Sequence, residues 1–309
     1  MTGLRSSQGI RRRAGCMAKR STKKRSTKKS TRDGSHLVMV LPDLHFPVHD
    51  RSALRIVLRA FEHLKPQRVV ILGDWLDAAF ASAHPASSRE EAKQGGYIAN
   101  EIEPCRRVLK QFEEYAEEII YLEGNHEFRV ERLITREKGA WLAIPELVLP
   151  ENLLSMDRQK KFTWVPYQHN ADTNTLPHYK IADGLIAVHG WSTSKYAARK
   201  HLELVRGWSI VHGHTHRAQS DTVRHPMTGS INQAWSPGCL SQLQPMWQHS
   251  SPTEWVHGFS LIYCRNNLSR WTAYTVTIDR GECILPDGTK ITDGGVKKQL
   301  YCEETISKG

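Results

Sequence analysis

The sequence predicts an α/β fold built from short buried strands that alternate with helices. Five continuous apolar runs have the length and content of buried strands; they cover residues 37–41, 68–72, 119–122, 185–188 and 208–211. Apolar residues recur at helical spacing from Ala53 to Leu64, between the first two runs, and Pro66 ends that helix. Strand–helix alternation with short connections is typical of an α/β architecture with central, well-buried strands.

The remaining elements extend this pattern, which changes near residue 217. Helices are expected at 89–118, 128–148 and 195–206, and strands at 161–189 with a turn at Asp183-Gly184. Short strand-like segments then follow one another at 217–225, 231–235, 255–264 and 270–279. These segments predict a second, more antiparallel sheet that packs on the first.

Length and composition allow one large domain or two small ones. Of the 309 residues, 39% are hydrophobic, which is enough for a real core. No apolar run reaches the roughly 18 residues of a membrane span, and the basic N-terminus lacks the apolar segment of a secretory signal. The six cysteines are scattered without a C-x-x-C pair, which suits reduced thiols. We therefore expect a cytoplasmic protein with no membrane partner.

The excess positive charge lies in the N-terminal tail. Residues 1–34 contain 12 of the 43 Lys and Arg residues and one of the 32 acidic residues, and so account for the net charge of +11. Residues 1–35 contain almost nothing apolar and are expected to be a disordered basic tail. Two interpretations stay open. The tail binds nucleic acid through its phosphates, or it is a solvated extension, with Met17 as an alternative start.

Each of the five predicted strands ends in residues that can bind metal ions. The fragments are Asp43-x-His45, Gly73-Asp74-x-x-Asp77, Gly124-Asn125-His126-Glu127, His189-Gly190 and Gly213-His214-x-His216. Ligands of α/β folds gather outside the carboxyl ends of the strands, and imidazole is the commonest protein ligand of transition metals. Single residues have structural explanations, such as Asp77 as a helix N-cap and Asn125 as a turn residue. Together, the five fragments favour a metal site.

In this order, the fragments resemble the calcineurin-like metallophosphoesterase superfamily over roughly residues 37–240. The chain is most similar to compact bacterial and phage-type phosphoesterases, through Gly124-Asn125-His126-Glu127-x-Arg129 and Trp255-x-x-Gly258-Phe259. The resemblance implies a four-layer αββα sandwich of two packed mixed β-sheets flanked by helices. We assign this metallophosphoesterase domain to residues 36–280 and expect a C-terminal extension at 281–309.

The resemblance also implies a hydrolase with a dinuclear metal centre. The expected metal ligands are Asp43, His45 and His216 for one ion, Asn125, His189 and His214 for the other, and Asp74 as the bridge between them. Nitrogen and oxygen ligands without thiolate suit Mn, Fe or Zn better than Mg, and manganese is the ion we expect. A hydroxide between the two ions would attack phosphorus, because coordination lowers the pKa of water.

Three further residues are expected to act beside the metal ligands. By resemblance, His126 stabilises the phosphoryl group or protonates the leaving oxygen, and Asp77 orients His126. Protein Ser/Thr phosphatases of the superfamily carry Arg-Gly after the second motif, where this chain has Ala78-Ala79. This departure disfavours a phosphoprotein substrate. Arg129 is the candidate substitute for binding phosphate; the alternative is a surface arginine on a helix.

Three functions remain open at this point. A phosphodiesterase acting on a nucleotide or nucleic acid is favoured, because the phosphate-gripping arginine is missing and the tail is basic. A phosphomonoesterase acting on a nucleotide or phosphoprotein is the second candidate. The third is a non-catalytic nucleic-acid-binding module on the same fold, which the complete set of ligands disfavours.

Aromatic and histidine residues near the motifs leave two further alternatives. Trp75 and Trp191 adjoin the second and fourth fragments. Each either stacks on a base or sugar of the substrate or packs in the core. His84 and His169 lie in predicted loops that can reach the site, although no motif supports them.

Overall fold

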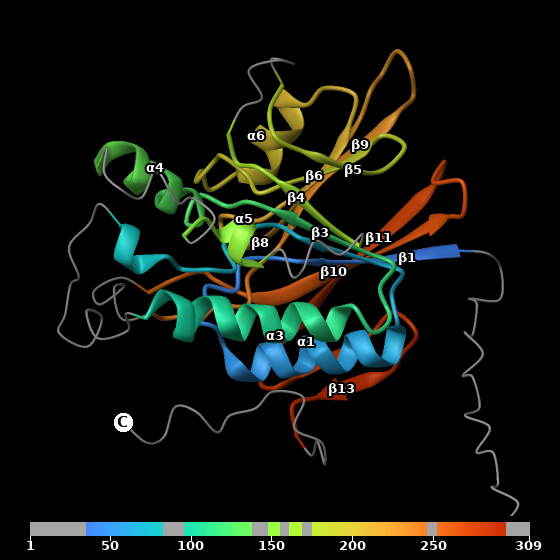
Figure 1. Ribbon diagram of the computed structural model, residues 1–309. Helices are drawn as coiled ribbons and strands as arrows, with labels where there is room; N and C mark the ends of the chain where they lie inside the picture. The colour runs from blue at the N-terminus through green and yellow to red at the C-terminus, as the bar shows by residue number, and fades with distance from the viewer. Residues whose placement is uncertain are drawn as a thin grey trace, which may run out of the picture.

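The computed structural model describes residues 35–82, 96–137, 148–154, 161–168, 175–245 and 252–294. The predicted basic tail, apart from Ser35, lies outside the described residues, and so do His84 and His169. Two large mixed sheets pack face to face, with helices on their outer sides (Figure 1). This is the four-layer αββα arrangement expected from the sequence.

The first sheet has six strands in the order β11-β10-β1-β2-β3-β4. Its strands are β1 (Ser35–Leu41), β2 (Arg68–Ile71), β3 (Glu118–Leu122), β4 (Phe162–Val165), β10 (His257–Arg265) and β11 (Trp271–Ile278). Strands β1 to β4 are parallel, whereas β10 pairs antiparallel with β1 and β11 antiparallel with β10. The carboxyl ends of β1, β2 and β3 therefore lie at one edge of this sheet.

The second sheet has five strands in the order β5-β6-β7-β9-β8. Its strands are β5 (Tyr179–Ala182), β6 (Leu185–Val188), β7 (Ser209–His212), β8 (Ala218–Arg224) and β9 (Ile231–Pro237). The prediction that the four C-terminal segments form this sheet together is wrong, because β10 and β11 join the first sheet and only β8 and β9 join the second. Alternating apolar residues identify a strand, but they do not identify the strand that it pairs with.

Helices cover the outer face of each sheet. Helices α1 (Arg51–Leu64) and α3 (Glu103–Phe112) lie side by side below the first sheet, and α6 (Ala197–Leu204) lies on the second (Figure 1). A π-helical turn at Tyr97–Ile102 precedes α3, and the short helices α4 (Phe128–Glu137) and α5 (Pro150–Leu154) follow β3. None of the described helices is long and apolar enough to span a membrane.

The last described residues form a small hairpin beside α1. Its strands are β12 (Glu282–Ile284) and β13 (Lys290–Thr292), and Figure 1 shows β13 next to that helix. The side chains of Cys283, Leu285 and Ile291 are buried in the same core cluster as α1. Residues 281–294 therefore extend the helical layer of the domain.

Alternation along β1 explains how one strand serves two cores. Leu37, Met39 and Leu41 are buried in the cluster that includes α1 and α3. Val38 and Val40 point to the other face, in the cluster between the two sheets. Successive side chains of a strand point to opposite faces. Because both faces of β1 are buried, all of its residues from Leu37 to Leu41 are apolar, as expected for a strand covered on both sides.

Candidate metal centre

The loops after β1, β2, β3, β6 and β7 carry the metal-binding fragments, and the structure brings these loops together. Four of the candidate ligands have positive φ angles: His45 at 56°, Asp74 at 51°, His214 at 69° and His216 at 58°. Residues other than glycine adopt a positive φ rarely and at a cost in free energy, and residues that do so cluster at functional sites.

Two glycines allow the loops to approach one another closely. A Cβ atom on Gly124 would lie 2.1 Å from Asp74 Oδ1, and one on Gly213 would lie 2.5 Å from Asp43 Oδ2. Any side chain at either position would displace a carboxylate. The glycines of these fragments are therefore required by the packing of the neighbouring acid.

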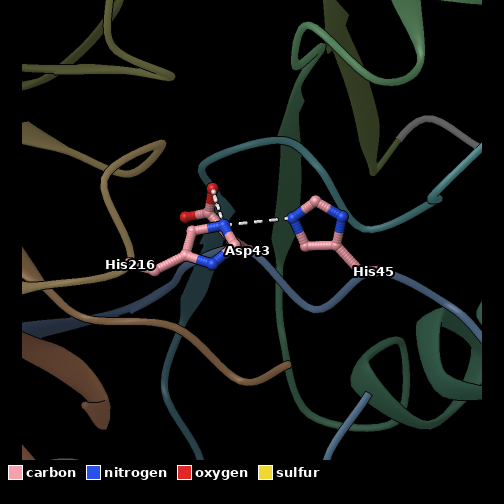
Figure 2. Close-up of side chains that lie close together, drawn as sticks. All are labelled: Asp43, His45 and His216. Carbon is pink, nitrogen blue, oxygen red and sulfur yellow. Dashed lines mark hydrogen bonds and ion pairs between the residues drawn. The ribbon is translucent and has the colours of Figure 1, made fainter. Parts of the chain in front are cut away.

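Asp43, His45 and His216 form the first group of candidate ligands. His216 Nε2 lies 3.2 Å from His45 Nε2 and 3.4 Å from Asp43 Oδ1. Figure 2 shows this nitrogen of His216 facing both partners. All three residues are buried, and the ligand atoms that they offer lie within 4.8 Å of one another.

Asp74, His189 and His214 form the second group. His189 Nε2 lies 3.4 Å from Asp74 Oδ2 and 2.9 Å from Asn125 Oδ1, so Asn125 belongs to the same site. His189 Nδ1 lies 2.7 Å from the Leu72 carbonyl oxygen, to which it donates. This contact leaves Nε2 as the nitrogen that can bind an ion, a common arrangement for metal-binding imidazoles.

Asp74 lies between the two groups. Its Oδ2 atom is 3.4 Å from His189 Nε2 on one side and 3.8 Å from His45 Nε2 on the other. Two ligand atoms that share a tetrahedral ion at about 2.1 Å lie about 3.4 Å apart, which is close to these separations. The positions of the donor atoms therefore fit two neighbouring divalent ions that share the Asp74 carboxylate.

The charges in the site also fit cations. Burial alone would raise the pKa of Asp74, but the imidazoles of His189 and His126 outweigh it and hold that pKa well below its usual range. Burial alone would lower the pKa of His189, but the Asp74 carboxylate raises it to about 9. Buried carboxylates thus draw positive charge into the site, which is what a metal ion supplies.

His126, Asp77 and Arg129 lie beside the candidate ligands as a connected set. Asp77 Oδ1 is 3.1 Å from the Nδ1 atoms of both His126 and His45, so this carboxylate contacts two imidazoles where the sequence suggested one. Arg129 Nη2 lies 2.8 Å from His126 Nε2. Burial lowers the pKa of His126, but the carboxylates of Asp74 and Asp77 outweigh it and raise that pKa.

Glu127, the last residue of the third fragment, has a structural role in the site that the sequence analysis did not predict. It is fully buried. Its Oε1 accepts hydrogen bonds from the backbone of Trp75 and Leu76 and from the Tyr121 hydroxyl, at 2.7 to 2.9 Å. Its Oε2 accepts from the backbone of Asp74 and Gly124. Glu127 thereby ties the loop that carries Asp74 to the loop that carries Asn125.

The structure separates the two tryptophans that adjoin the motifs. Trp75 is fully buried, and its Nε1 donates to the Pro42 carbonyl oxygen at 3.2 Å. Its suggested role in stacking on a substrate is therefore wrong, because no ligand can reach the ring. Trp191 is 37% exposed. A further tryptophan, Trp255, packs edge-on against His216 with ring centroids 4.1 Å apart, a contact at the site that the sequence pattern does not predict.

All ten residues predicted for the site are in contact with one another directly or through a neighbour. They are Asp43, His45, Asp74, Asp77, Asn125, His126, Arg129, His189, His214 and His216. The family model described as calcineurin-like phosphoesterase matches residues 36–245, more than half of the chain. The chain belongs to the calcineurin-like phosphoesterase family. It is a metal-dependent hydrolase that acts on phosphate esters.

Two phage proteins are similar to this family member along most of their length. The Gene 54 protein of Mycobacterium phage L5 is 27% identical over 240 residues, which cover 74% of this chain and 89% of the phage protein. The Gene 54 protein of Mycobacterium phage D29 is 26% identical over 243 residues, which cover 75% and 91%.

Solved structures with a similar fold share little sequence with this phosphoesterase. Wild-type Vps29 of Entamoeba histolytica complexed with zinc is 15% identical, with a TM-score of 0.39, over 83% of this chain and 99% of that chain. The E. coli phosphoesterase Yfce is 16% identical, with a TM-score of 0.31, over 79% and 100%.

Proposed function

We propose that this phosphoesterase hydrolyses phosphodiesters of the nucleotide or nucleic-acid class, with two manganese ions. Asp43, His45 and His216 would hold one ion, and Asn125, His189 and His214 would hold the other. The observation that carries the proposal is the position of Asp74 Oδ2, between His45 and His189. When bound, the ions supply charge for the phosphoryl oxygens and lower the pKa of the attacking water.

His126 would donate a proton to the leaving oxygen as the ester bond breaks. Asp77 contacts His126 Nδ1 and so keeps a proton on that nitrogen and favours the imidazolium form, in which Nε2 carries the second proton, the one passed to the leaving oxygen. In the structure, Arg129 Nη2 donates a hydrogen bond to His126 Nε2 at 2.8 Å. A phosphate oxygen is a stronger acceptor for a guanidinium group than a neutral imidazole. Substrate binding would therefore draw Arg129 away from His126 and free Nε2 for proton transfer.

The preference for diesters rests on the residues that follow the second motif. Ala78 and Ala79 stand where protein phosphatases of the superfamily carry Arg-Gly, and Ala78 is fully buried. A dianionic monoester needs more positive charge around its free oxygens than a diester, which carries a single negative charge. Arg129 hydrogen-bonds to two other residues of the site, through the Asp77 carbonyl oxygen at 3.2 Å and His126 Nε2 at 2.8 Å.

A comparison of two chromogenic esters tests this preference. With manganese added, kcat/KM should be higher for bis-p-nitrophenyl phosphate than for p-nitrophenyl phosphate. A higher kcat/KM for the monoester would favour the alternative, a phosphomonoesterase. Hydrolysis of neither ester under manganese, iron or zinc would favour a non-catalytic module on this fold.

The basic tail supports nucleic acid as the larger substrate or partner, because residues 1–34 carry the net charge of the chain. Deletion of residues 1–34 should leave hydrolysis of small esters unchanged. It should weaken binding to DNA or RNA and flatten the dependence of that binding on salt. A loss of small-ester hydrolysis would instead place the tail at the active site.

A further inference from the structure

A pocket of about 190 Å³ opens beside the second group of candidate ligands. Its lining residues come from the ends of β3, β4 and β6 and from the segment before β5, and include Glu123, Tyr167, Leu176, Val188, His189 and Trp191. Most of these side chains are apolar, and two of them, Tyr167 and Trp191, are aromatic. The exposed fractions of Trp191 and Leu176 are 37% and 46%, so this pocket faces solvent. We call it the Trp191 pocket.

The Trp191 side chain, which forms one wall of the pocket, packs against the first of two stacked histidines. The Trp191 ring lies 4.3 Å from the ring of His201, and its backbone N–H donates to His201 Nε2 at 3.2 Å. The His201 ring in turn stacks on His212, with centroids 4.0 Å apart and planes 12° apart. Both histidines are fully buried. Trp191 is therefore the outermost ring of a fixed column rather than a loose surface side chain.

The wall formed by Tyr167 is held as firmly. Its backbone N–H donates to Glu123 Oε2 at 2.8 Å. Its ring packs on Phe128 with centroids 5.4 Å apart and meets the edge of His189 at 6.0 Å. A pocket whose aromatic walls are already in place binds a flat ring without the entropic cost of ordering them.

The position of His189 connects the Trp191 pocket to the reacting phosphate. His189 lines the pocket, and its Nε2 atom lies 3.4 Å from the Asp74 carboxylate. Only the His189 side chain therefore separates a group bound in the pocket from the expected position of the phosphate. Drug-sized ligands occupy pockets of roughly 300–1,000 Å³, so a pocket of about 190 Å³ suits one ring system and not a whole nucleotide.

The lining of the pocket offers few groups that bind a phosphate. No Lys or Arg is among the lining residues, and Glu123 places a carboxyl group there. The phosphate belongs at the histidines and the Asp74 carboxylate, where cations would bind. The Trp191 pocket is left for an uncharged part of the same molecule, and base-stacking on aromatic side chains accepts any nucleobase.

We propose that the Trp191 pocket binds the base of a nucleotide whose phosphate ester lies at the metal site. The proposal rests on the proposed function, because it assigns the part of the substrate that is not phosphate. It makes Trp191 a specificity-determining residue that contacts the substrate without taking part in the chemistry.

Equilibrium binding tests the pocket separately from hydrolysis. The two probes are phosphonate analogues of adenosine 5′-monophosphate and of ribose 5-phosphate, in which a methylene group replaces the ester oxygen so that neither is hydrolysed. Their Kd values are measured by calorimetry on the full manganese-loaded chain. The probe with the base should bind roughly 5- to 150-fold more tightly, the range that stacking of one base gives.

Three variants locate the effect. Trp191→Ala should bring the ratio of the two Kd values close to one, and Trp191→Phe, which keeps an aromatic face, should restore most of it. The matched control is Trp208→Ala. Trp208 has almost the same exposed fraction, 38%, but it precedes β7 at the opposite end of the second sheet. This control should keep the ratio of the unmodified chain.

Equal Kd values for the two probes on the unmodified chain would overturn the proposal, and so would a ratio that Trp191→Ala and Trp191→Phe leave unchanged. Hydrolysis of bis-p-nitrophenyl phosphate, measured in parallel, separates this failure from failure of the proposed function. Ester hydrolysis without base preference refutes the pocket alone. Base preference without ester hydrolysis supports the pocket and refutes the diesterase.

Discussion

The Nε2 atoms of His45 and His216 lie 3.2 Å apart, although 171 positions separate the two residues in the chain. His45 Nδ1 is held by the Asp77 carboxylate at 3.1 Å, so its Nε2 carries a lone pair directed at His216. Asp43 approaches the same nitrogen of His216 at 3.4 Å. Three donor atoms from the loops after two strands in different sheets thus converge on one point, as the ligands of a metal ion do.

His126→Ala should separate turnover from metal binding. Loss of a general acid lowers kcat by roughly 10²- to 10⁴-fold. The metal content should stay that of the unmodified chain, because His126 is outside the proposed ligand set, although its ring nitrogen lies within 4.8 Å of the ligand atoms of His45 and Asp74. Steady-state kinetics and elemental analysis on the same preparation measure both. Equal loss of metal and activity would make His126 a ligand.

Glu127→Gln should destabilise the fold. An amide nitrogen accepts no hydrogen bond, so two or three of the five groups that donate to Glu127 lose their acceptor. At 1–3 kcal/mol for each buried unpaired group, the free energy of unfolding should fall by about 2–9 kcal/mol, as urea denaturation measures.

Glu131→Gln is the control for Glu127→Gln. Glu131 lies on α4 and accepts a hydrogen bond from the exposed Gln168 at 3.0 Å. Surface changes of this kind alter the free energy of unfolding by about 0.5 kcal/mol or less. If both variants unfolded at the same urea concentration as the unmodified chain, Glu127 would not be the residue that joins the two loops.

Gly124→Ala should remove metal binding through a single methyl group. The added Cβ would lie 2.1 Å from Asp74 Oδ1 and 2.4 Å from the Asp74 backbone nitrogen, so the proposed bridging carboxylate must move. Gly294→Ala is the control, because nothing lies within 4 Å of the Cβ position there. Isothermal titration with manganese compares the two variants; unchanged affinity in Gly124→Ala would show that Asp74 is not a ligand.

Glu101 should make the fold less stable as the pH rises towards 8. Burial, together with the charges of Asp77 and Glu127, raises the pKa of Glu101 from 4.5 to about 8. Between these values the folded chain keeps a proton that the unfolded chain has released. The stabilisation from Glu101 is therefore complete below pH 4.5 and is lost as the pH rises through 8.

Glu101→Gln tests this pH dependence, because glutamine keeps an oxygen that can accept from the Ala78 N–H, which Glu101 Oε2 does at 2.7 Å. Urea denaturation at about pH 5.5 and about pH 7.5 gives the free energy of unfolding of both chains. Between the lower and the higher pH, the free energy of unfolding of the unmodified chain should fall relative to that of the variant. A difference that does not change with pH would mean that Glu101 is ionised in the fold.

The sequence predicted the strands and the candidate site more closely than the pairing of the strands. Apolar runs identify buried strands because burial depends on the residues of the run itself. Aspartates and histidines directly after such runs must lie at the carboxyl ends of strands, and the resemblance to the calcineurin-like family placed His45 and His216 in one expected group. Whether β10 pairs with β1 or joins the second sheet depends on distant residues, and periodicity does not encode this choice.

Glu127 and Trp75 show the same limit at the level of single side chains. An acid just before a helix has a sufficient local explanation as a helix-terminal residue, so nothing in the sequence marks Glu127 as a buried acceptor of five hydrogen bonds. Trp75 lies within one metal-binding fragment and Trp191 directly follows another. The fold buries the first under α3 and leaves the second at the mouth of a pocket.

The metal content of Asp74→Ala, measured by mass spectrometry after manganese reconstitution and dialysis, tests the dinuclear site most directly. The unmodified chain should hold about two ions, and so should the control Asp183→Ala, whose carboxylate is on the surface. Asp74→Ala should hold neither ion, because Asp74 is the proposed bridge and its Oδ2 lies 3.4 Å from His189 Nε2 and 3.8 Å from His45 Nε2, one candidate ligand of each ion. An Asp74→Ala chain that still held about two ions would contradict a site bridged by Asp74.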